Sequence, residues 1–167
     1  MFKEKNSMAS NDKLDKVDIQ ILQALQENAR LTMKEIAARV SLSSTPVFER
    51  WKRLERQGYI KKYTVILDEE KLHQGFTVFC KVRLSHINNE VAGRFTQAVT
   101  EMPQVSECYN ISGAYDYMLK INVPDMKTYK DFLLNVLGKV ENVASLESVF
   151  VMDEIKHIYG VPLPEVR

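Results

Sequence analysis

Cysteine, proline, glycine and long apolar runs are all scarce in this chain. It contains two cysteines, five prolines and six glycines among 167 residues. Cys80 and Cys108 lack C-x-x-C spacing and neighbouring histidines, so we expect two small buried thiols in a reducing cytosol. No apolar run approaches membrane-spanning length, and the N-terminus is too polar for a signal peptide. The sequence therefore predicts a cytoplasmic protein with no membrane partner and no metal site.

The patterns that accompany catalysis are also missing. His73, His86 and His157 each stand alone, and no nucleophile elbow, glycine-rich phosphate loop or metal-ligand spacing accompanies them. Asp153 and Glu154 are expected on neighbouring positions of one strand, where they face opposite sides. We therefore expect no enzyme and no cofactor, although a fold alone does not exclude catalysis.

Charge is distributed unevenly along the chain. The formal net charge is only +1, but residues 1–66 hold 13 Lys and Arg against 8 Asp and Glu, a balance of +5. Residues 67–167 hold 10 Lys and Arg against 14 Asp and Glu, a balance of −4. Such asymmetry predicts a basic module that meets a polyanion and a second module that does not. The length suits one medium domain or two small ones.

The stretch 31–63 has the pattern of a helix-turn-helix. Thr32 begins a helix with apolar residues at i, i+3, i+4 and i+7, and Glu35 completes a T-x-x-E capping box. The polar corner 41–43 is short enough for a tight turn between two helices. A longer helix is expected over about 44–57. A short helix, a three-residue turn and a longer helix together predict a DNA-reading unit.

A preceding helix is expected over 13–30, which completes a three-helix unit. Ile19 lies off its apolar stripe, which leaves two interpretations: a lone surface residue or a contact with a partner subunit. In the second half of the helix-turn-helix, Pro46 is tolerated in the first turn of the helix and Gly58 ends it.

The outward face of the longer helix carries the expected chemistry. Basic side chains and small hydroxyls gather there, and both are suitable donors to base edges and phosphates. The alternative is an ordinary solvated face, because Glu49 and Glu55 are mixed in. We expect direct DNA contacts from Ser44, Thr45, Arg50 and Arg53, and phosphate contacts from Lys34, Lys52 and Arg56.

Composition changes after Gly58. The β-branched and aromatic residues 59–67 predict a strand, in which Lys61 and Lys62 suit either phosphate contact or protection of a sheet edge. The acidic stretch 68–75 is the expected linker. The predicted division is a flexible tail over 1–12, a helix-turn-helix domain over 13–62, a linking strand and linker over 63–75, a second domain over 76–158 and a C-terminal tail over 159–167.

In the second half of the chain, segments with the two-residue alternation of strands take turns with segments that have the apolar spacing of helices. Strands are expected over 77–85, 105–112, 117–123 and 143–156, and helices over 89–102 and 126–140. The order β-α-β-β-α-β predicts a ferredoxin-like antiparallel sheet with both helices on one face. The fold class is therefore α+β, with a three-helix, winged-helix-like helix-turn-helix domain before the sheet. Phe79, Met118 and Phe150 are expected near the open face, which favours homodimerisation.

With both halves in view, the chain resembles the Lrp/AsnC family of prokaryotic transcription regulators. The resemblance covers residues 13–156. It rests on LDKVDIQILQALQENARLT, IAARVSLSSTPVFERWKRLERQGYI, VSECYNISGAYDYMLKINVPDM and VFVMDEIK. The segments STPVFERWKRLERQGYI and YDYMLKINVPDM look most similar to the leucine-responsive branch.

The resemblance implies a regulator of transcription that binds double-stranded DNA and responds to a small amino acid such as leucine. It also implies dimers that assemble further, commonly to octamers. An effector-independent, DNA-organising architectural protein of the same fold is the alternative. The positions that match the family's effector site are Ser112, Gly113, Tyr115, Asp116 and Ser148.

The chemistry of the predicted effector loop suits a zwitterion. Asp116 offers an acceptor for an ammonium, and the backbone N–H groups around Gly113 offer donors to a carboxylate. The alternative is that these two residues simply form a turn between strands. Ala114 departs from the acidic or polar residue that family members often carry here, which leaves the effector's identity open.

Overall fold

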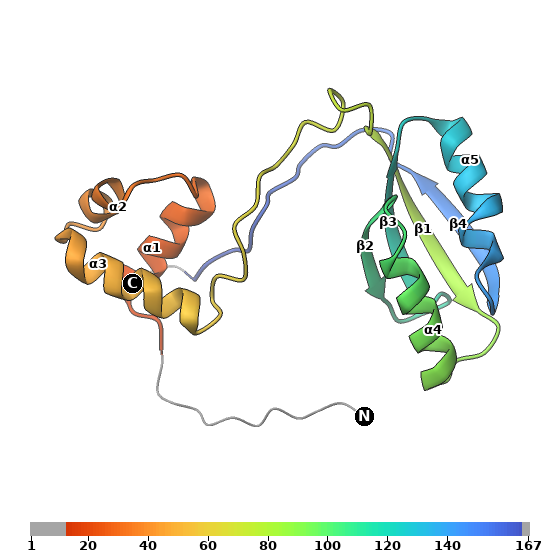
Figure 1. Ribbon diagram of the computed structural model, residues 1–167, viewed down its shortest axis with the longest axis horizontal. Coiled ribbons are helices and arrows are strands. Elements are labelled where there is room, and N and C mark those ends of the chain that lie inside the picture. Colours follow the sequence, from red (N-terminus) through yellow and green to blue (C-terminus); the bar gives the residue numbers. More distant parts are fainter. Residues whose placement is uncertain (1–12, 165–167) are drawn as a thin grey trace. The chain divides into compact units, whose positions relative to one another are not determined.

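The computed structural model describes residues 13–164, so the tail predicted over residues 1–12 lies outside the described residues. The chain forms two compact units (Figure 1). Of the described residues, 13–65 and 156–164 belong to the helical unit, and the sheet unit runs over Ile66–Ile155. The helical unit therefore includes a C-terminal segment that the sequence did not assign to it. No helix within residues 13–164 is long and apolar enough to cross a membrane.

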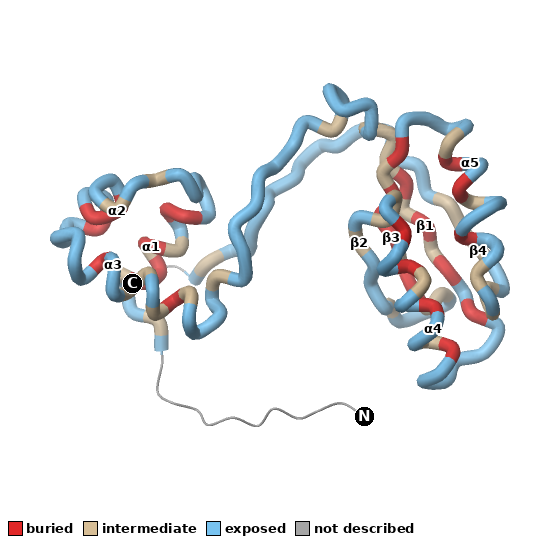
Figure 2. The backbone as a smooth tube through the Cα atoms, in the orientation of Figure 1, coloured by how far each residue is buried: buried red, intermediate tan, exposed pale blue. Residues whose placement is uncertain are grey.

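Within residues 13–164, three helices build the helical unit, as predicted. They are α1 (Lys16–Glu27), α2 (Met33–Arg39) and α3 (Ser44–Arg56). Their apolar stripes close one small core, and Figure 2 shows buried stretches on all three helices. The buried members of this core are Ile21, Leu25, Ile36, Ala37, Val40, Val47 and Leu54.

Local signals set the ends of these helices. The capping box between Thr32 and Glu35 is confirmed at the start of α2. Asp15 and Asp18 form a second capping box at the start of α1. The turn before α3 contains Ser41 at a φ of 55°, and Gly58 at a φ of 79° ends α3 as expected.

The strand predicted over 59–67 is wrong. Residues 61–68 form neither helix nor strand, and among the described residues that precede β1 no strand is present. An extended segment becomes a strand only when a neighbouring strand takes up its backbone N–H and C=O groups. Lys61 and Lys62 therefore protect no strand edge in this chain. Val65 remains 76% exposed.

The C-terminal segment packs against α1. The Gln26 side-chain amide donates to the Val161 carbonyl over 3.1 Å and accepts from the Val161 N–H over 3.3 Å. Gly160 allows this approach, because a Cβ there would lie 2.4 Å from the Gln26 Cδ. Ile19 is seven residues before Gln26, on the same helical face, and is only 7% exposed. Of the two interpretations of Ile19, the lone surface residue is therefore wrong.

The sheet unit has the predicted βαββαβ order. Its elements are β1 (Phe76–Leu84), α4 (Asn89–Thr100), β2 (Val105–Asn110), β3 (Tyr117–Val123), α5 (Met126–Asn135), a short 3-10 helix η1 (Leu137–Lys139) and β4 (Val143–Phe150). The strand order is β2-β3-β1-β4, and each neighbouring pair is antiparallel. The α+β, ferredoxin-like class is confirmed, although β4 ends six residues before the predicted 156.

The two faces of the sheet differ in chemistry. Val78, Cys80 and Val82 point from β1 into the core under α4 and α5, whereas Phe79 and Lys81 alternate onto the other face. Phe150 pairs with Val78 and therefore lies on the helix side, where it packs edge-on against Tyr129 of α5. Its predicted place near the open face is wrong. Cys80 is buried as predicted, but Cys108 on the edge strand β2 is exposed.

Candidate nucleic-acid interface and effector site

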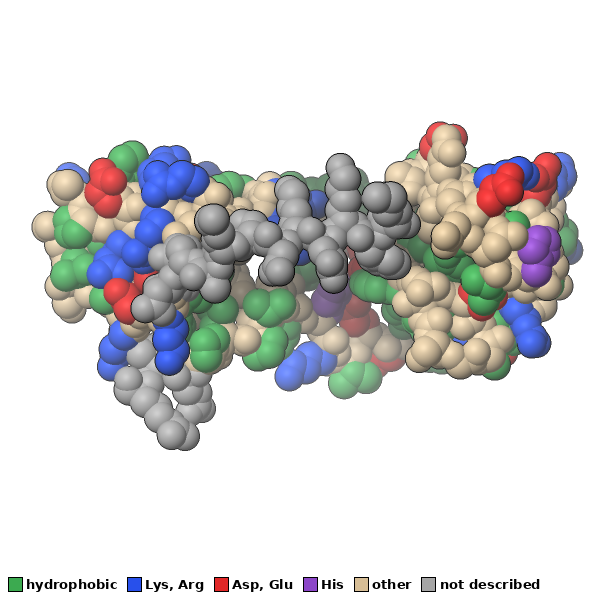
Figure 3. All heavy atoms as spheres, turned by 90° about the horizontal axis from the view of Figure 1, so that it is seen from below, with side chains coloured by type: hydrophobic (Ala, Val, Ile, Leu, Met, Phe, Trp, Pro, Cys, Tyr) green, Lys and Arg blue, Asp and Glu red, His purple; other side chains and the backbone are tan. Residues whose placement is uncertain are grey.

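The outward face of α3 begins with hydroxyl groups and continues with positive charge. Ser44 and Thr45 are exposed at the start of the helix. Lys52 and Arg56 follow Thr45 at i+7 and i+11, which places the three on one exposed stripe. Lys34 is exposed on α2. On the face drawn in Figure 3, Lys and Arg side chains gather over the helical unit.

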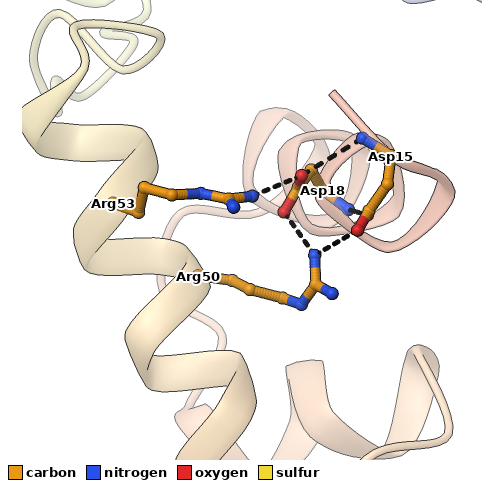
Figure 4. A network of polar contacts seen from close by, with 4 residues as sticks. All are labelled: Asp15, Asp18, Arg50 and Arg53. Atoms are coloured by element: carbon orange, nitrogen blue, oxygen red, sulfur yellow. Dashed lines mark hydrogen bonds and ion pairs between the residues drawn. The ribbon is translucent and has the colours of Figure 1, made fainter. Parts of the chain in front are cut away.

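Arg50 and Arg53 point elsewhere (Figure 4). The Arg53 Nη2 lies 2.5 Å from Asp18 Oδ2, and the Arg50 Nη1 lies 2.9 Å from Asp18 Oδ1. Arg50 also reaches Asp15 Oδ2 at 2.6 Å. The prediction that both guanidinium groups extend from the outward face is wrong, because both turn toward α1.

Asp18 is the centre of this network. It is 1% exposed, and its carboxylate also accepts the Asp15 backbone N–H at 3.2 Å. Burial by itself would raise the pKa of Asp15, but hydrogen bonds from the Asp18 N–H and from Arg50 outweigh it and hold that pKa below its usual value. The network links the start of α1 to the middle of α3 and so sets how α3 lies on the unit.

An aromatic side chain that the sequence argument passed over lies on the same outward face. Phe48 is 45% exposed, three residues after Thr45 and four before Lys52. The Lys52 ammonium lies 5.9 Å from the centre of the Phe48 ring, within cation–π range. The available signal was its position, because Phe48 falls outside the inward stripe of Val47, Trp51 and Leu54.

Hydrogen bonds hold Tyr63, at the start of the segment that links the two units, to α3. The Trp51 Nε1–H donates to the Tyr63 hydroxyl over 2.5 Å, and that hydroxyl donates to Glu55 over 2.8 Å. Glu55 also pairs with Lys52 at 2.8 Å. The hydrogen bonds from Lys52 and Tyr63 lower the pKa of Glu55.

In the sheet unit, the predicted effector residues occupy the loop between β2 and β3. Ser112 and Gly113 are exposed, and Gly113 has a φ of 122°, which strains any residue with a side chain. The Tyr115 hydroxyl donates to Glu147 Oε2 over 2.7 Å. Asp116 Oδ2 accepts the Leu84 backbone N–H over 2.7 Å. Asp116 therefore anchors the loop to the end of β1, and its carboxylate retains lone pairs for a ligand.

Ser148 does not join this loop. Its hydroxyl lies 2.6 Å from the Tyr129 hydroxyl, on the helix side of the sheet. Glu147, the partner of Tyr115, is the preceding residue of β4 and therefore points to the opposite face. Burial raises the pKa of Tyr129 to about 12, so its phenol stays protonated at neutral pH. The structure thus gives Ser148 a packing partner instead of a place beside Tyr115.

A basic helix-turn-helix unit followed by a βαββαβ unit is the architecture of a DNA-binding regulator that carries a separate ligand-binding domain. Two family models match the chain accordingly, a winged helix-turn-helix DNA-binding model over residues 14–61 and an Lrp/AsnC ligand binding domain over residues 77–161. The chain belongs to the Lrp/AsnC family, and it is a DNA-binding transcription regulator rather than an enzyme.

Individual relatives match along nearly the whole chain. The leucine-responsive regulatory protein of Escherichia coli K12 is 38% identical over 143 residues, which cover 86% of this chain and 87% of that protein. The DNA-binding transcriptional activator DecR of the same organism is 35% identical over 150 residues, covering 90% and 99%. A Neisseria meningitidis transcriptional regulator in complex with L-Met superimposes with a TM-score of 0.86 at 37% identity, covering 90% and 97%.

Proposed function

We propose that α3 enters the major groove of duplex DNA with its N-terminal end toward the base edges. Ser44 and Thr45 are exposed at that end, as base contacts require. Lys34, Lys52 and Arg56 are proposed as phosphate contacts because they are exposed cations on the same unit. The observation that carries the proposal is the exposed stripe of Thr45, Lys52 and Arg56.

Arg50 and Arg53 receive a different proposed role. Both guanidinium groups are engaged by Asp18, and a guanidinium that leaves this carboxylate would remove one of the two cations that balance its buried negative charge. We therefore propose that they hold α3 in its reading position instead of contacting bases, which replaces the role expected from the sequence.

Replacing Arg56 with alanine is expected to weaken binding to every duplex and to lower the slope of log affinity against log salt by about one per protomer. The measurement is fluorescence anisotropy of the full-length chain at several salt concentrations, with a duplex enriched from a randomised library. Lys139→Ala, at an exposed lysine of the sheet unit, is the matched control and should leave the slope unchanged. An unaltered slope for Arg56→Ala would remove this residue from the proposed interface.

The effector proposed for the sheet unit is a small amino acid such as leucine or methionine. The support is the ligand-binding domain match and the L-Met complex of the Neisseria relative. Asp116 would accept the ammonium, the backbone N–H groups around Gly113 would bind the carboxylate, and Ser112 and Tyr115 would line the site. Ser148 is left out, because Tyr129 occupies its hydroxyl on the other face.

Linkage between effector and assembly is the proposed mechanism. An amino acid that prefers one assembly state shifts the oligomer equilibrium and so changes how many DNA-reading units act together. A homodimer that assembles to an octamer in the cytoplasm is the proposed form. Consecutive apolar residues of the linking segment, Val65, Ile66 and Leu67, are exposed, and such side chains favour burial against a second copy.

Sedimentation velocity of the full-length protein, with and without L-leucine, L-methionine and other amino acids, tests this mechanism. We expect one amino acid to shift the population between multiples of the dimer. A monomer at all concentrations would contradict the proposed assembly. An assembly that no amino acid shifts would instead support the DNA-organising alternative, which the ligand-domain match does not favour.

A further inference from the structure

Phe48 is a large apolar side chain that lies outside the core of the helical unit. It is 45% exposed and does not belong to the core that α1, α2 and α3 enclose. Its place is the second turn of α3, between Thr45 at i−3 and Lys52 at i+4. In the proposed orientation of α3, this stripe lies against the floor and walls of the groove.

The surroundings of Phe48 favour nucleic acid over a protein partner. The centres of protein interfaces are depleted of charged residues. Here the Lys52 ammonium lies 5.9 Å from the ring centre, and Arg56 follows four residues later on the same stripe. An aromatic ring beside exposed cations complements a surface that combines negative phosphates with an apolar group.

We propose that Phe48 reads thymine by contact with its C5-methyl group. This methyl group is the apolar feature that thymine presents in the major groove, and phenylalanine is among the side chains suited to contact it. The hydroxyls of Ser44 and Thr45 bind polar base edges, so Phe48 adds a different kind of selectivity at a neighbouring base pair. The inference rests on the proposed entry of α3 into the groove.

The test begins with duplexes that the full-length protein enriches from a randomised library. Each thymine of an enriched duplex is then replaced, one at a time, by deoxyuridine, which removes the methyl group and keeps the base pairing. We expect one position in each half-site to lose about fourfold in affinity, as for one buried methyl group, and about fifteenfold when both half-sites are changed.

Variants assign this loss to the ring. Phe48→Ala should bind the thymine and deoxyuridine duplexes equally at that position, whereas Phe48→Leu, which keeps an apolar side chain, should retain a preference for thymine. Arg56→Ala is the matched control, because it should weaken both duplexes and leave their affinity ratio at about four. Circular dichroism of each variant checks that the helices are intact.

Two results would overturn the assignment. They are a wild-type protein that responds to deoxyuridine at no position, and a Phe48→Ala protein that keeps the full thymine preference. Failure of the wild-type protein to enrich any sequence is a distinct outcome, because it would overturn the DNA-reading role of α3 itself and the inference with it.

Discussion

Replacing Asp18 with alanine is expected to lower the free energy of unfolding of the helical unit by about 3 kcal/mol, the usual cost of removing one partner of a buried ion pair. Asp18 is 1% exposed and binds both Arg50 and Arg53. The expected loss is at the lower end of the range because these arginine side chains are 28% and 36% exposed, so water compensates part of it. The loss of Asp18 is expected to destabilise Arg53 more than Arg50, because the Arg53 Nε is already buried without a hydrogen-bond partner.

Urea unfolding followed by tryptophan fluorescence measures this loss, because the single tryptophan, Trp51, lies in α3. Glu27→Ala is the matched control. Glu27 is a carboxylate of the same helix, but its pair with Arg39 is exposed on both sides, at 71% and 46%. Exposed pairs contribute about 0–1 kcal/mol, so this variant should unfold nearly as the wild type does. Equal losses for the two variants would show that burial of Asp18 is not the cause.

Replacing Asp116 with asparagine is expected to reduce affinity for the amino-acid effector about ten- to hundredfold, because a charged hydrogen bond to the ligand ammonium is lost. Asparagine keeps an oxygen that can accept the Leu84 N–H, so the loop and basal DNA binding should remain intact. Isothermal titration calorimetry with L-leucine and L-methionine measures the affinity, and DNA binding is followed in parallel.

Two further variants separate charge from structure at this loop. Asp116→Ala also removes the acceptor of the Leu84 N–H, so it should lower the stability of the sheet unit as well as the effector response. Asp131→Asn changes an exposed carboxylate of α5 and should alter neither. An Asp116→Asn protein with wild-type effector affinity would contradict the assignment of the ammonium site to this carboxylate.

Arg50, Arg53, Ser148 and Phe150 lie elsewhere than the sequence predicts for one shared reason. Helical spacing placed Arg50 and Arg53 on a basic face, but their partner Asp18 is 32 and 35 residues away in the chain. The alternation of side chains along β4 divides its residues between two faces, but it does not say which face packs against the helices. That is decided by the pairing of β4 with β1. Ser148 and Phe150 therefore came out on the helix side. Neither the ion pairs with Asp18 nor the pairing of β4 with β1 can be recognised from neighbouring residues in the sequence.

The segment over residues 59–67 shows that strand-like composition does not by itself produce a strand. Its composition over residues 59–67 is that of a strand, and Val65, Ile66 and Leu67 have the side chains that sheets favour. Strand formation also needs a partner at hydrogen-bonding distance, which composition does not specify. The same holds at the C-terminus, where the contact between Gln26 and Val161 joins residues 135 positions apart.

The sequence by itself determined the three helices, their turn, the βαββαβ order and the family. Each of these follows from periodicity, capping pairs such as Thr32 with Glu35, and turn residues such as Gly58, all of which act within a few residues. Only the tertiary structure decided which cations remain on the outward face of α3, that Phe48 is exposed among them, and that Asp116 anchors the proposed effector loop to the end of β1. These features depend on packing and on strand register between distant segments, and the free energy of such contacts exists only once the chain has folded.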